Sequence, residues 1–372
     1  MQDIFSIFTN FFLRDAYTVI VESMAIFGWI FFAWLLLYML IFVWIRYKQI
    51  QYKKDWKWEL LAIDIPPENV QTPKAVEQLF SHLAGVIDQP NLAEKFRQGF
   101  KQEWFSFEII SIEGYIQFLI RTESKFRNLL EAAVYAQYPD ADITEVEDYV
   151  DTMPQKFPNE EYEIFAEDYG LAEHDAYPIR TYSAFEHSIS KDTVLKDPMG
   201  TFLESFTRIG PGEQMWFQMI IKPMPNSWKE RSIEKIKELI GDTSAKKKSG
   251  TFMPIAKEGG KAWGELSAQL LGSVRSEGGA SDSKPEEPNK MRYLTPGQKV
   301  VIEAMEEKIS KIGFKTKMRG IYIARKEVFS PTRGIHALRG AISQFNVPSA
   351  NSLVPTYKAS THYFFSKQRT LY

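Results

Sequence analysis

The pattern of apolar and polar positions divides the chain into one long uncharged run and many short periodic segments. Residues 23–45, SMAIFGWIFFAWLLLYMLIFVWI, contain no charged side chain, and thirteen of these 23 residues are Leu, Ile, Phe or Val. As a helix this run is about 34 Å long, which is enough to cross the apolar core of a bilayer. At roughly −0.3 to −0.6 kcal/mol for each of these residues, insertion is favoured by about 4–8 kcal/mol, and no charge opposes it. The run therefore predicts a transmembrane helix.

Charges on the two flanks predict the direction in which this helix crosses. Upstream, Arg14 is the single basic residue; downstream, Arg46, Lys48, Lys53, Lys54 and Lys57 follow closely. Because Lys and Arg are enriched on the cytoplasmic side, we expect a single-pass protein of the cell membrane with its C-terminal body in the cytoplasm. The residues expected to anchor the helix at this interface are Trp44, Arg46, Tyr47, Lys48 and Trp56.

Residues 1–22 precede the span and are expected to be extracytoplasmic or interfacial. Residues 4–13, IFSIFTNFFL, are apolar but too few to span, so they form either an interfacial segment or an extension of the helix. A cleaved signal peptide is not expected, because a basic n-region and a small-residue cleavage site are both missing.

The rest of the chain predicts an α+β body of two ferredoxin-like units, each with the order β-α-β-β-α-β. The first occupies residues 57–150. Its strand 58–66 is followed by a helix that begins at Thr72-Pro73 and by a hairpin at Glu113-Gly114, where glycine supplies a positive φ. Ser124 is expected to cap the second helix, and residues 141–148 are expected to close the sheet.

The second unit is expected over residues 160–366. Residues 160–169 predict an additional strand, 177–185 the first strand of the repeated order, and 358–367 the last. Residues 213–223 are apolar on both faces, which is typical of a strand in the middle of its sheet. Gly320 is expected to form a β-bulge within the strand at 313–327.

Between its two middle strands this unit is expected to carry helices at 227–240 and 295–312, the second of which begins at the cap Thr295-Pro296. A segment rich in Gly, Ser and charge lies between these helices at residues 243–290. Such a composition buries too little apolar surface to fold compactly, so a flexible insertion is expected. Inside it, residues 263–274 form an amphipathic pattern, either a helix that docks a partner or one that folds back on the unit.

Composition restricts the chemistry that the chain can perform. The sequence has no cysteine, which excludes disulfides, thiolate zinc sites and cysteine nucleophiles, and its five histidines lack metal-binding spacing. At Gly260-Lys261, the nearest approach to a phosphate-binding loop, Ile255 occupies the position of the first glycine. We therefore expect no catalytic residue, no cofactor and no metal, and a protein that is not an enzyme.

Residues 308–339 are strongly basic. The candidate contacts for an anionic partner are Lys315, Lys317, Arg319, Arg333 and Arg339. Alternate positions on a strand place the first three on one face, and helical spacing places Arg333 and Arg339 together. Such a region either is a solvated face or attracts nucleic acid, anionic lipid or an acidic protein.

Three segments resemble a known module: GEQMWFQMIIKPMPNSW (212–228), GFKTKMRGIYIARKE (313–327) and ALRGAISQFNVPSANSL (337–353). They are similar to an uncharacterised membrane-anchored module that lies ahead of HerA/FtsK-type ATPase domains in conjugation and type IV secretion-like proteins. The resemblance covers roughly residues 55–365, and Tyr372 falls where the motor would be expected to begin, so the motor is expected on another chain or not at all.

The resemblance implies a membrane scaffold that docks a motor ATPase or other secretion-machine subunits at the cytoplasmic face, and we expect a homo-oligomer. The alternative is a membrane-anchored protein that binds nucleic acid, such as DNA, through residues 308–339.

Overall fold

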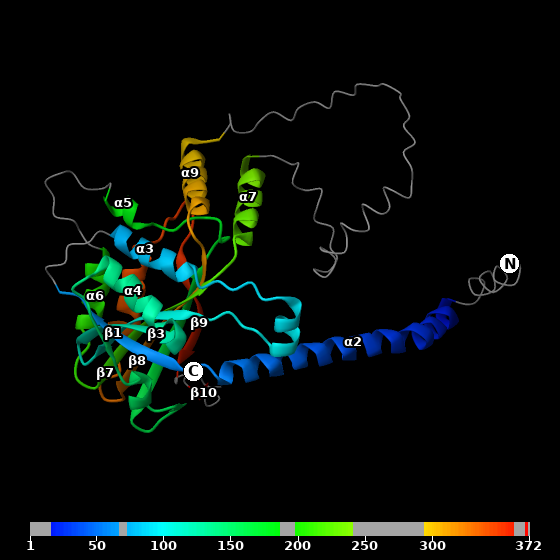
Figure 1. The fold of residues 1–372 in the computed structure, drawn as a ribbon, viewed down its shortest axis with the longest axis horizontal. Coiled ribbons are helices and arrows are strands. Elements are labelled where there is room, and N and C mark those ends of the chain that lie inside the picture. Colours follow the sequence, from blue (N-terminus) through cyan, green and yellow to red (C-terminus); the bar gives the residue numbers. More distant parts are fainter. Residues whose placement is uncertain (1–15, 67–72, 187–197, 241–293, 361–368, 371–372) are drawn as a thin grey trace, which may run out of the picture. The chain divides into compact units, whose positions relative to one another are not determined.

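The computed structural model describes residues 16–66, 73–186, 198–240, 294–360 and 369–370. It is a mixed α/β protein with an apolar N-terminal helix and antiparallel strands (Figure 1). Most of the N-terminal segment 1–22 and all of the insertion at 243–290 lie outside the described residues. The chain forms two compact units, which are treated separately below. Unit 1 comprises Met1–Ile109, Gln117–Met153 and Gln218–Pro223, and unit 2 comprises Ile110–Ile116, Pro154–Phe217 and Met224–Tyr372.

Helix α2 (Ala16–Lys54) is the first described element and has 39 residues. Its segment Gly28–Lys54 is long and apolar enough to cross a membrane, and none of its most apolar window is buried. Trp29 and Leu40, for example, are both 66% exposed. A core helix of a soluble protein buries its apolar stripe against a neighbouring element, whereas the apolar surface of α2 has no such cover within the described residues.

The sheet of unit 1 is built around β1, which pairs in antiparallel fashion with β3 and β4. Its strands are β1 (Trp58–Asp64), β2 (Phe105–Ile112), β3 (Tyr115–Glu123) and β4 (Asp142–Glu145), in the spatial order β4-β1-β3-β2. Helices α3 (Pro73–Ala84) and α4 (Arg127–Gln137) contact each other. Leu61, Leu83 and Leu130 are almost completely buried and form part of the core. Ser124 belongs to a short 3-10 turn, η2 (Ser124–Phe126), that leads into α4, so its expected role as a helix cap is wrong.

The turn between β2 and β3 is the expected two-residue hairpin. Glu113 has a φ of 53° and Gly114 a φ of 92°, the left-handed conformation that tight hairpin turns require. Both residues belong to unit 2, where the Glu113 N–H donates to the carbonyl of Glu213 (3.0 Å) and the Gly212 N–H donates to the Glu113 carboxylate (2.9 Å).

The sheet of unit 2 is centred on β6, which pairs in antiparallel fashion with β8 and β9. Its strands are β6 (Tyr162–Leu171), β8 (Phe314–Arg325), β9 (Leu353–Ser360) and the first part of β7 (Glu213–Pro223), which belongs to this unit as far as Phe217. Their spatial order is β7-β8-β6-β9. The portion of β7 in this unit lies between β8 and the end of β2, which confirms the central position expected for residues 213–223. A further antiparallel pair joins β5 (Lys156–Phe157) to β10 (Arg369–Thr370).

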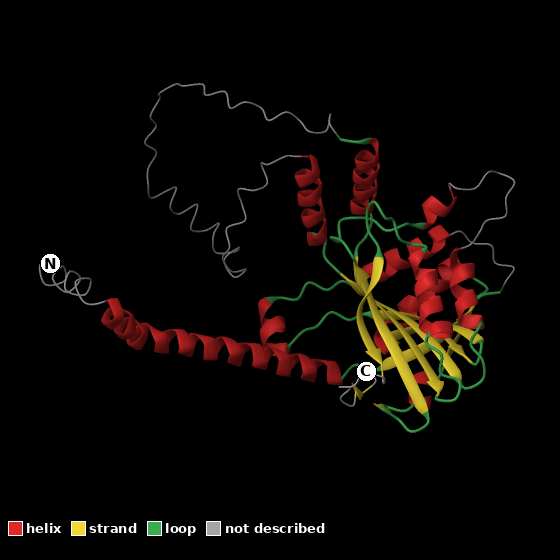
Figure 2. Ribbon diagram, turned by 180° about the vertical axis from the view of Figure 1, so that it is seen from behind, coloured by secondary structure: helices red, strands yellow, loops and turns green. Residues whose placement is uncertain are grey.

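Unit 2 contains several helices, drawn in red in Figure 2. They are α5 (Tyr182–Glu186), α6 (Pro198–Thr207), α7 (Ser227–Ile240), α9 (Pro296–Ser310), the turn η6 (Thr332–His336) and α10 (Ala337–Ser343). Helices α6 and α10 contact each other, as do α7 and α9. The expected start of α9 is confirmed by a complete capping box in which Thr295 and Gln298 bond reciprocally. Phe206, Tyr322, Ile335 and Leu338 are fully buried in this unit.

The two units share one arrangement. If the strands of each are counted along the chain, the spatial order in both is fourth, first, third, second. In unit 1 that order is β4-β1-β3-β2, and in unit 2 it is β9-β6-β8-β7.

Three expectations about the second unit are wrong in detail. The first strand of its repeated order is β6 rather than residues 177–185, where α5 forms instead. The last strand, β9, begins earlier than the expected 358–367, because Leu353 already pairs with Leu171. At Gly320 the register of β8 against β6 runs without a shift, so there is no bulge on that side. An added Cβ at Gly320 would lie 2.7 Å from Leu338 Cδ2, so the glycine makes room for α10.

Candidate membrane-interface site

The end of α2 carries four of the five expected interface residues. Trp44 is half exposed, and its indole Nε1–H donates to the carbonyl of Phe96 (3.3 Å). The Lys48 Nζ lies 5.1 Å from the centre of the Trp44 ring, a distance at which a cation and an indole attract each other. Arg46 makes a similar contact with Phe42 (5.4 Å), and Tyr47 is exposed. The structure therefore brings aromatic and basic side chains together at this level of the helix.

A short segment that the sequence analysis did not identify lies against this part of α2. It is the π-helical turn η1 (Glu94–Gln98), which contacts α2 in unit 1 (Figures 1 and 2). Asn91 and Glu94 begin it by exchanging hydrogen bonds between side chain and backbone (2.8 and 2.9 Å). Gly99 ends it with a φ of 74°. The pattern N-x-x-E followed by Gly is a local helix signal that could have identified the segment.

Gly99 brings the backbone of this segment onto the backbone of α2. A Cβ at residue 99 would lie 2.3 Å from the carbonyl carbon of Lys48 and 2.6 Å from the Gln49 nitrogen. No side chain fits at such distances, and the positive φ disfavours one independently. The contact between η1 and α2 therefore depends on glycine.

A chain of aromatic rings joins the end of α2 to the strands of unit 1. Tyr52 contacts Phe100 (5.7 Å between ring centres) and Trp56 (6.2 Å), and Trp56 contacts Trp58 at the start of β1 (5.7 Å). Trp58 contacts Trp104, directly before β2, at 4.2 Å. We call these five residues, Tyr52, Trp56, Trp58, Phe100 and Trp104, the aromatic junction. Each such pair contributes about 0.5–1.5 kcal/mol beyond the area it buries, so the junction stabilises the attachment of α2 to unit 1.

Basic residues surround this attachment. Lys101 is partly buried, and burial lowers the pKa of its ammonium group; the positive charges of Lys53, Lys222 and Arg46 lower that pKa further. We call Arg46, Lys53, Lys101 and Lys222 the helix-end cations. Because their charges repel one another, the region has a positive potential that favours anions.

The expected basic patch of residues 308–339 is organised differently. Lys317 and Arg319, on β8, both form ion pairs with Asp168 on β6 (3.0 and 3.1 Å). Arg333 pairs with Glu213 (2.6 Å), and Arg339 pairs with Glu167. We call Lys317, Arg319, Arg333 and Arg339 the paired cations. Lys315, on the same strand, is exposed and forms no ion pair within the described part of the chain.

Two of these pairs satisfy carboxylates that are buried in unit 2. Glu213 is 1% exposed and also accepts hydrogen bonds from the Gly210 N–H (2.7 Å) and the Tyr322 hydroxyl. Burial and the hydrogen bond to Glu213 raise the pKa of Tyr322 to about 12. Glu167, also 1% exposed, receives two hydrogen bonds from the Arg339 guanidinium. Arg333 and Arg339 thus neutralise charges that would otherwise be isolated in the interior.

Unit 1 contains a comparable network around Glu108, which is 3% exposed. Its carboxylate accepts from the Tyr149 hydroxyl (2.6 Å) and from Arg121 (3.4 Å), and Gln218 donates to the Tyr149 oxygen (2.8 Å). Arg121 also forms a bidentate pair with Asp148 (2.6 and 2.9 Å). Burial alone would raise the pKa of Asp148, but the hydrogen bonds and charge of Arg121 outweigh it and lower that pKa.

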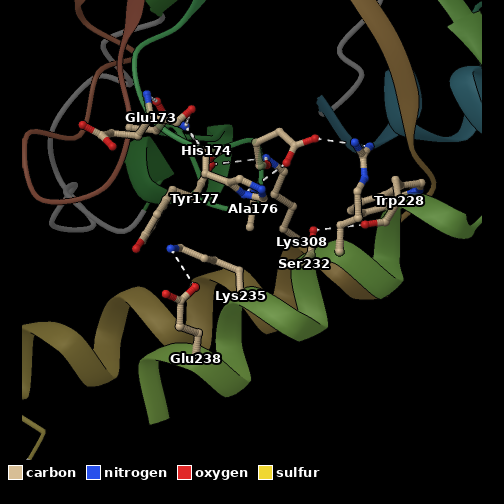
Figure 3. A network of polar contacts seen from close by, with 12 residues as sticks. Glu173, His174, Ala176, Tyr177, Trp228, Ser232, Lys235, Glu238 and Lys308 are labelled. Carbon is tan, nitrogen blue, oxygen red and sulfur yellow. Dashed lines mark hydrogen bonds and ion pairs between the residues drawn. The ribbon is translucent and has the colours of Figure 1, made fainter. Parts of the chain in front are cut away.

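A further polar network in unit 2 fixes the loop at residues 173–177 (Figure 3). The buried Asn351 side chain donates to the carbonyls of Glu173, His174 and Tyr177 and accepts from the Glu173 N–H. The Lys308 Nζ donates to the carbonyls of Asp175 (2.5 Å) and Tyr177 (3.3 Å), and burial lowers its pKa. These bonds engage mainly backbone groups, so the network holds a loop in place.

Metal-ligand geometry is not found in the described residues: no group of three or more His, Asp or Glu side chains there could hold an ion. The Nδ1 atom of His174 accepts a hydrogen bond from the backbone of Ala176 (3.1 Å), an ordinary role for a loop histidine.

Comparison with known proteins assigns most of the chain to a family. Residues 47–358 match a family described as a domain of unknown function (DUF8128). No curated protein and no solved structure matches the chain. The matched region begins at Tyr47, within the last turns of α2, so it includes η1 and the aromatic junction.

Proposed function

The chain belongs to the DUF8128 family, and we propose that it is a single-pass membrane scaffold that docks a separate motor ATPase. In this proposal α2 crosses the cell membrane, and the body on its C-terminal side lies in the cytoplasm. The motor belongs to a conjugation or type IV secretion-like translocation machine, and the scaffold acts as a homo-oligomer. The resemblance of residues 212–228, 313–327 and 337–353 to the module that accompanies HerA/FtsK-type motors supports this assignment.

The observation that carries the proposal is the way α2 is exposed and attached. Its apolar surface is uncovered over a length suited to a bilayer, while its C-terminal end is fixed to unit 1 by Gly99 and the aromatic junction. A tether that only retained the protein at a membrane would not need such packing. A scaffold does need it, because a fixed joint holds the body in a defined position at the bilayer.

The fold also supports a scaffold role. We propose that both units are ferredoxin-like, on the basis of the shared strand order and of a β-α-β-β-α-β order that in unit 2 is extended by α7 and α9 between β7 and β8. The buried carboxylates of Glu108, Glu167 and Glu213 form structural pairs with arginine and tyrosine side chains. Binding of partners is therefore the better hypothesis than catalysis.

Direct binding of DNA through residues 308–339 is the less favoured hypothesis. Four of its five candidate cations are engaged with carboxylates, two of which are buried, so contact with phosphates would compete with these pairs. A phosphate contact that must first break an internal pair gains little free energy.

The test is purification of the tagged full chain from crosslinked membranes of its native host, followed by identification of the recovered proteins. We expect a HerA/FtsK-type ATPase to be recovered with the chain, and ATP hydrolysis to be lost when that ATPase is deleted. The same purification from a strain with an equally tagged, unrelated single-pass protein is the control.

Recovery of the chain without any motor ATPase, from membranes in which crosslinking is otherwise efficient, would contradict the proposal. DNA binding by the purified chain that weakens steeply with salt would favour the alternative instead. Under that alternative, replacing Lys315, Lys317 and Arg319 with Ala would reduce the salt dependence by roughly one phosphate contact for each residue.

A further inference from the structure

The segment at residues 91–99 exposes apolar side chains beside α2. Leu92 is 64% exposed and Phe96 is 48% exposed, and four positions in a helical turn place them on the same face. The segment is fixed at the level of Trp44 and Lys48 by the indole hydrogen bond to Phe96 and by the close approach of Gly99. This level is where the sequence predicts that α2 leaves the apolar core of the membrane.

Positive charge accompanies these apolar side chains. Lys95 and Arg97 on the segment are exposed, and the helix-end cations lie near its C-terminal end. Lys101 follows Gly99 by two residues; burial lowers the pKa of its ammonium group, and the positive charges of Lys53, Lys222 and Arg46 lower that pKa further. An anion placed here would relieve this repulsion.

We propose that residues 91–99 form a second membrane contact, in which Leu92 and Phe96 enter the headgroup region of an anionic bilayer beside α2. The helix-end cations, with Lys95 and Arg97, attract the phosphates of the lipid headgroups. The inference rests on the proposed membrane role of α2, and it adds a lipid requirement that the proposed function does not contain. Amphipathic segments with basic and aromatic residues bind in this way, about 5–10 Å into the boundary between headgroups and acyl chains.

Lipid fits this surface better than a protein partner does, for two reasons. The segment contacts α2, whose uncovered apolar surface by the same proposal already lies in lipid. The charges near it are predominantly basic, and the cytoplasmic leaflet is the anionic surface closest to them.

The absence of cysteine from the chain permits a direct test. Single cysteines at Leu92 and at Phe96 would each be labelled with a polarity-sensitive fluorophore in the otherwise unchanged full chain. The labelled proteins would be reconstituted in vesicles of phosphatidylcholine, alone or mixed with phosphatidylglycerol. Leu40→Cys in α2 and Tyr115→Cys at the exposed β2–β3 hairpin are the matched controls; these two positions are 66% and 69% exposed.

We expect emission at residues 92 and 96 to be several-fold higher than at residue 115 in mixed vesicles, and to be quenched by lipids that carry a spin label near the headgroup. Residue 40 should be quenched by lipids labelled deep in the acyl chain. If residue 40 responds while residues 92 and 96 behave like residue 115, the second contact is disproved and α2 still spans. If residue 40 shows no quenching, the membrane role of α2 itself fails.

The contribution of charge has its own readout. The label attached at residue 96 is either inserted in the bilayer or exposed to water. In mixed vesicles, Lys101→Gln should lower the ratio of the inserted to the exposed population by about fivefold, the usual effect of one basic residue near an anionic surface. In phosphatidylcholine alone the ratio should not change. Lys74→Gln, on the exposed start of α3, is the control and should leave the ratio unchanged in both. An equal ratio for Lys101→Gln and the parent chain in mixed vesicles would contradict the role assigned to the cations.

Discussion

The helix-end cations and the paired cations are both groups of four Lys and Arg residues, but they differ in their surroundings. Burial lowers the pKa of Lys101, and the nearby charges of Lys53, Lys222 and Arg46 lower it further. Arg333 and Arg339 instead meet buried carboxylates, and the pKa of Arg333 is raised, chiefly by its hydrogen bond to Glu213. A count of basic residues favours the second group as a binding surface, whereas the structure pairs each member of that group with a carboxylate and places other cations near Lys101. Availability to an anionic partner depends on pairing rather than on charge density.

The variant with the largest expected effect tests whether α2, the helix whose end carries Arg46 and Lys53 of the helix-end cations, lies in lipid. Replacing Leu35 and Leu36 with Arg should disfavour insertion by about 6 kcal/mol, because each charge near the centre of a span opposes it by about 2.5–3.5 kcal/mol. Much of the protein should then move from the pellet to the supernatant after carbonate extraction and ultracentrifugation. Tyr115→Arg, at the exposed hairpin, should leave the distribution as in the parent chain.

The next effect tests whether the paired cations are structural. Arg339→Ala removes the partner of Glu167, whose side chain is fully buried, and should lower the free energy of unfolding by about 3 kcal/mol. Thermal unfolding in detergent measures this loss. The matched control is Arg208→Ala, which breaks an exposed pair with Glu204 in the same unit and should cost at most about 1 kcal/mol. Equal losses in the two variants would remove the distinction between the two groups of cations.

The ion pair between Asp148 and Arg121 in unit 1 should make the stability of the fold depend on pH. Because the pKa of Asp148 is lowered in the folded state, its pair with Arg121 stabilises the protein at pH values above the ordinary carboxyl pKa of 3.8. This contribution is lost as the pH falls below that value and the carboxylate is protonated. Asp148→Asn should therefore cost about 2 kcal/mol at neutral pH and lose less stability than the parent chain on acidification. Parallel stability curves for the two proteins in this acid range would contradict the assignment.

The smallest effect has the opposite sign and sharpens the comparison most directly. Lys101→Gln in detergent without anionic lipid should raise the free energy of unfolding by a few tenths of a kcal/mol, because it removes repulsion among partly exposed cations. Lys74→Gln should have no measurable effect. Destabilisation by Lys101→Gln of the size expected for Arg339→Ala would mean that Lys101 is also a structural cation.

Local patterns predicted much of the fold. The uncharged run at 23–45, the start of α9 at Thr295 and the tight turn at Glu113-Gly114 each depend on neighbouring residues, and all three correspond to elements of the structure. The central position of β7 followed from its apolar residues on both faces.

What could not be predicted depends on contacts between distant residues. Arg339 and Glu167 are separated by 172 positions, and nothing local to either indicates the pair. The sequence predicts a bulge at Gly320, whereas the actual role of this glycine is to leave space for Leu338. That residue lies on another element, so the sequence of the strand alone does not indicate the contact. The segment η1 lacks a run of apolar residues long enough to predict a helix, and its position depends on the distant Lys48 backbone.

The close approach of Gly99 to Lys48 has a mechanical consequence. Five residues, from Phe100 to Trp104, connect Gly99 to the first residue of β2. The first and the last of them, Phe100 and Trp104, belong to the aromatic junction. Unit 1 therefore holds α2 at two separate points along the chain, its own continuation into β1 and the side contact at Gly99. Two attachments prevent free rotation about a single connection. A change in the tilt of α2 would therefore turn the sheet of unit 1 with it.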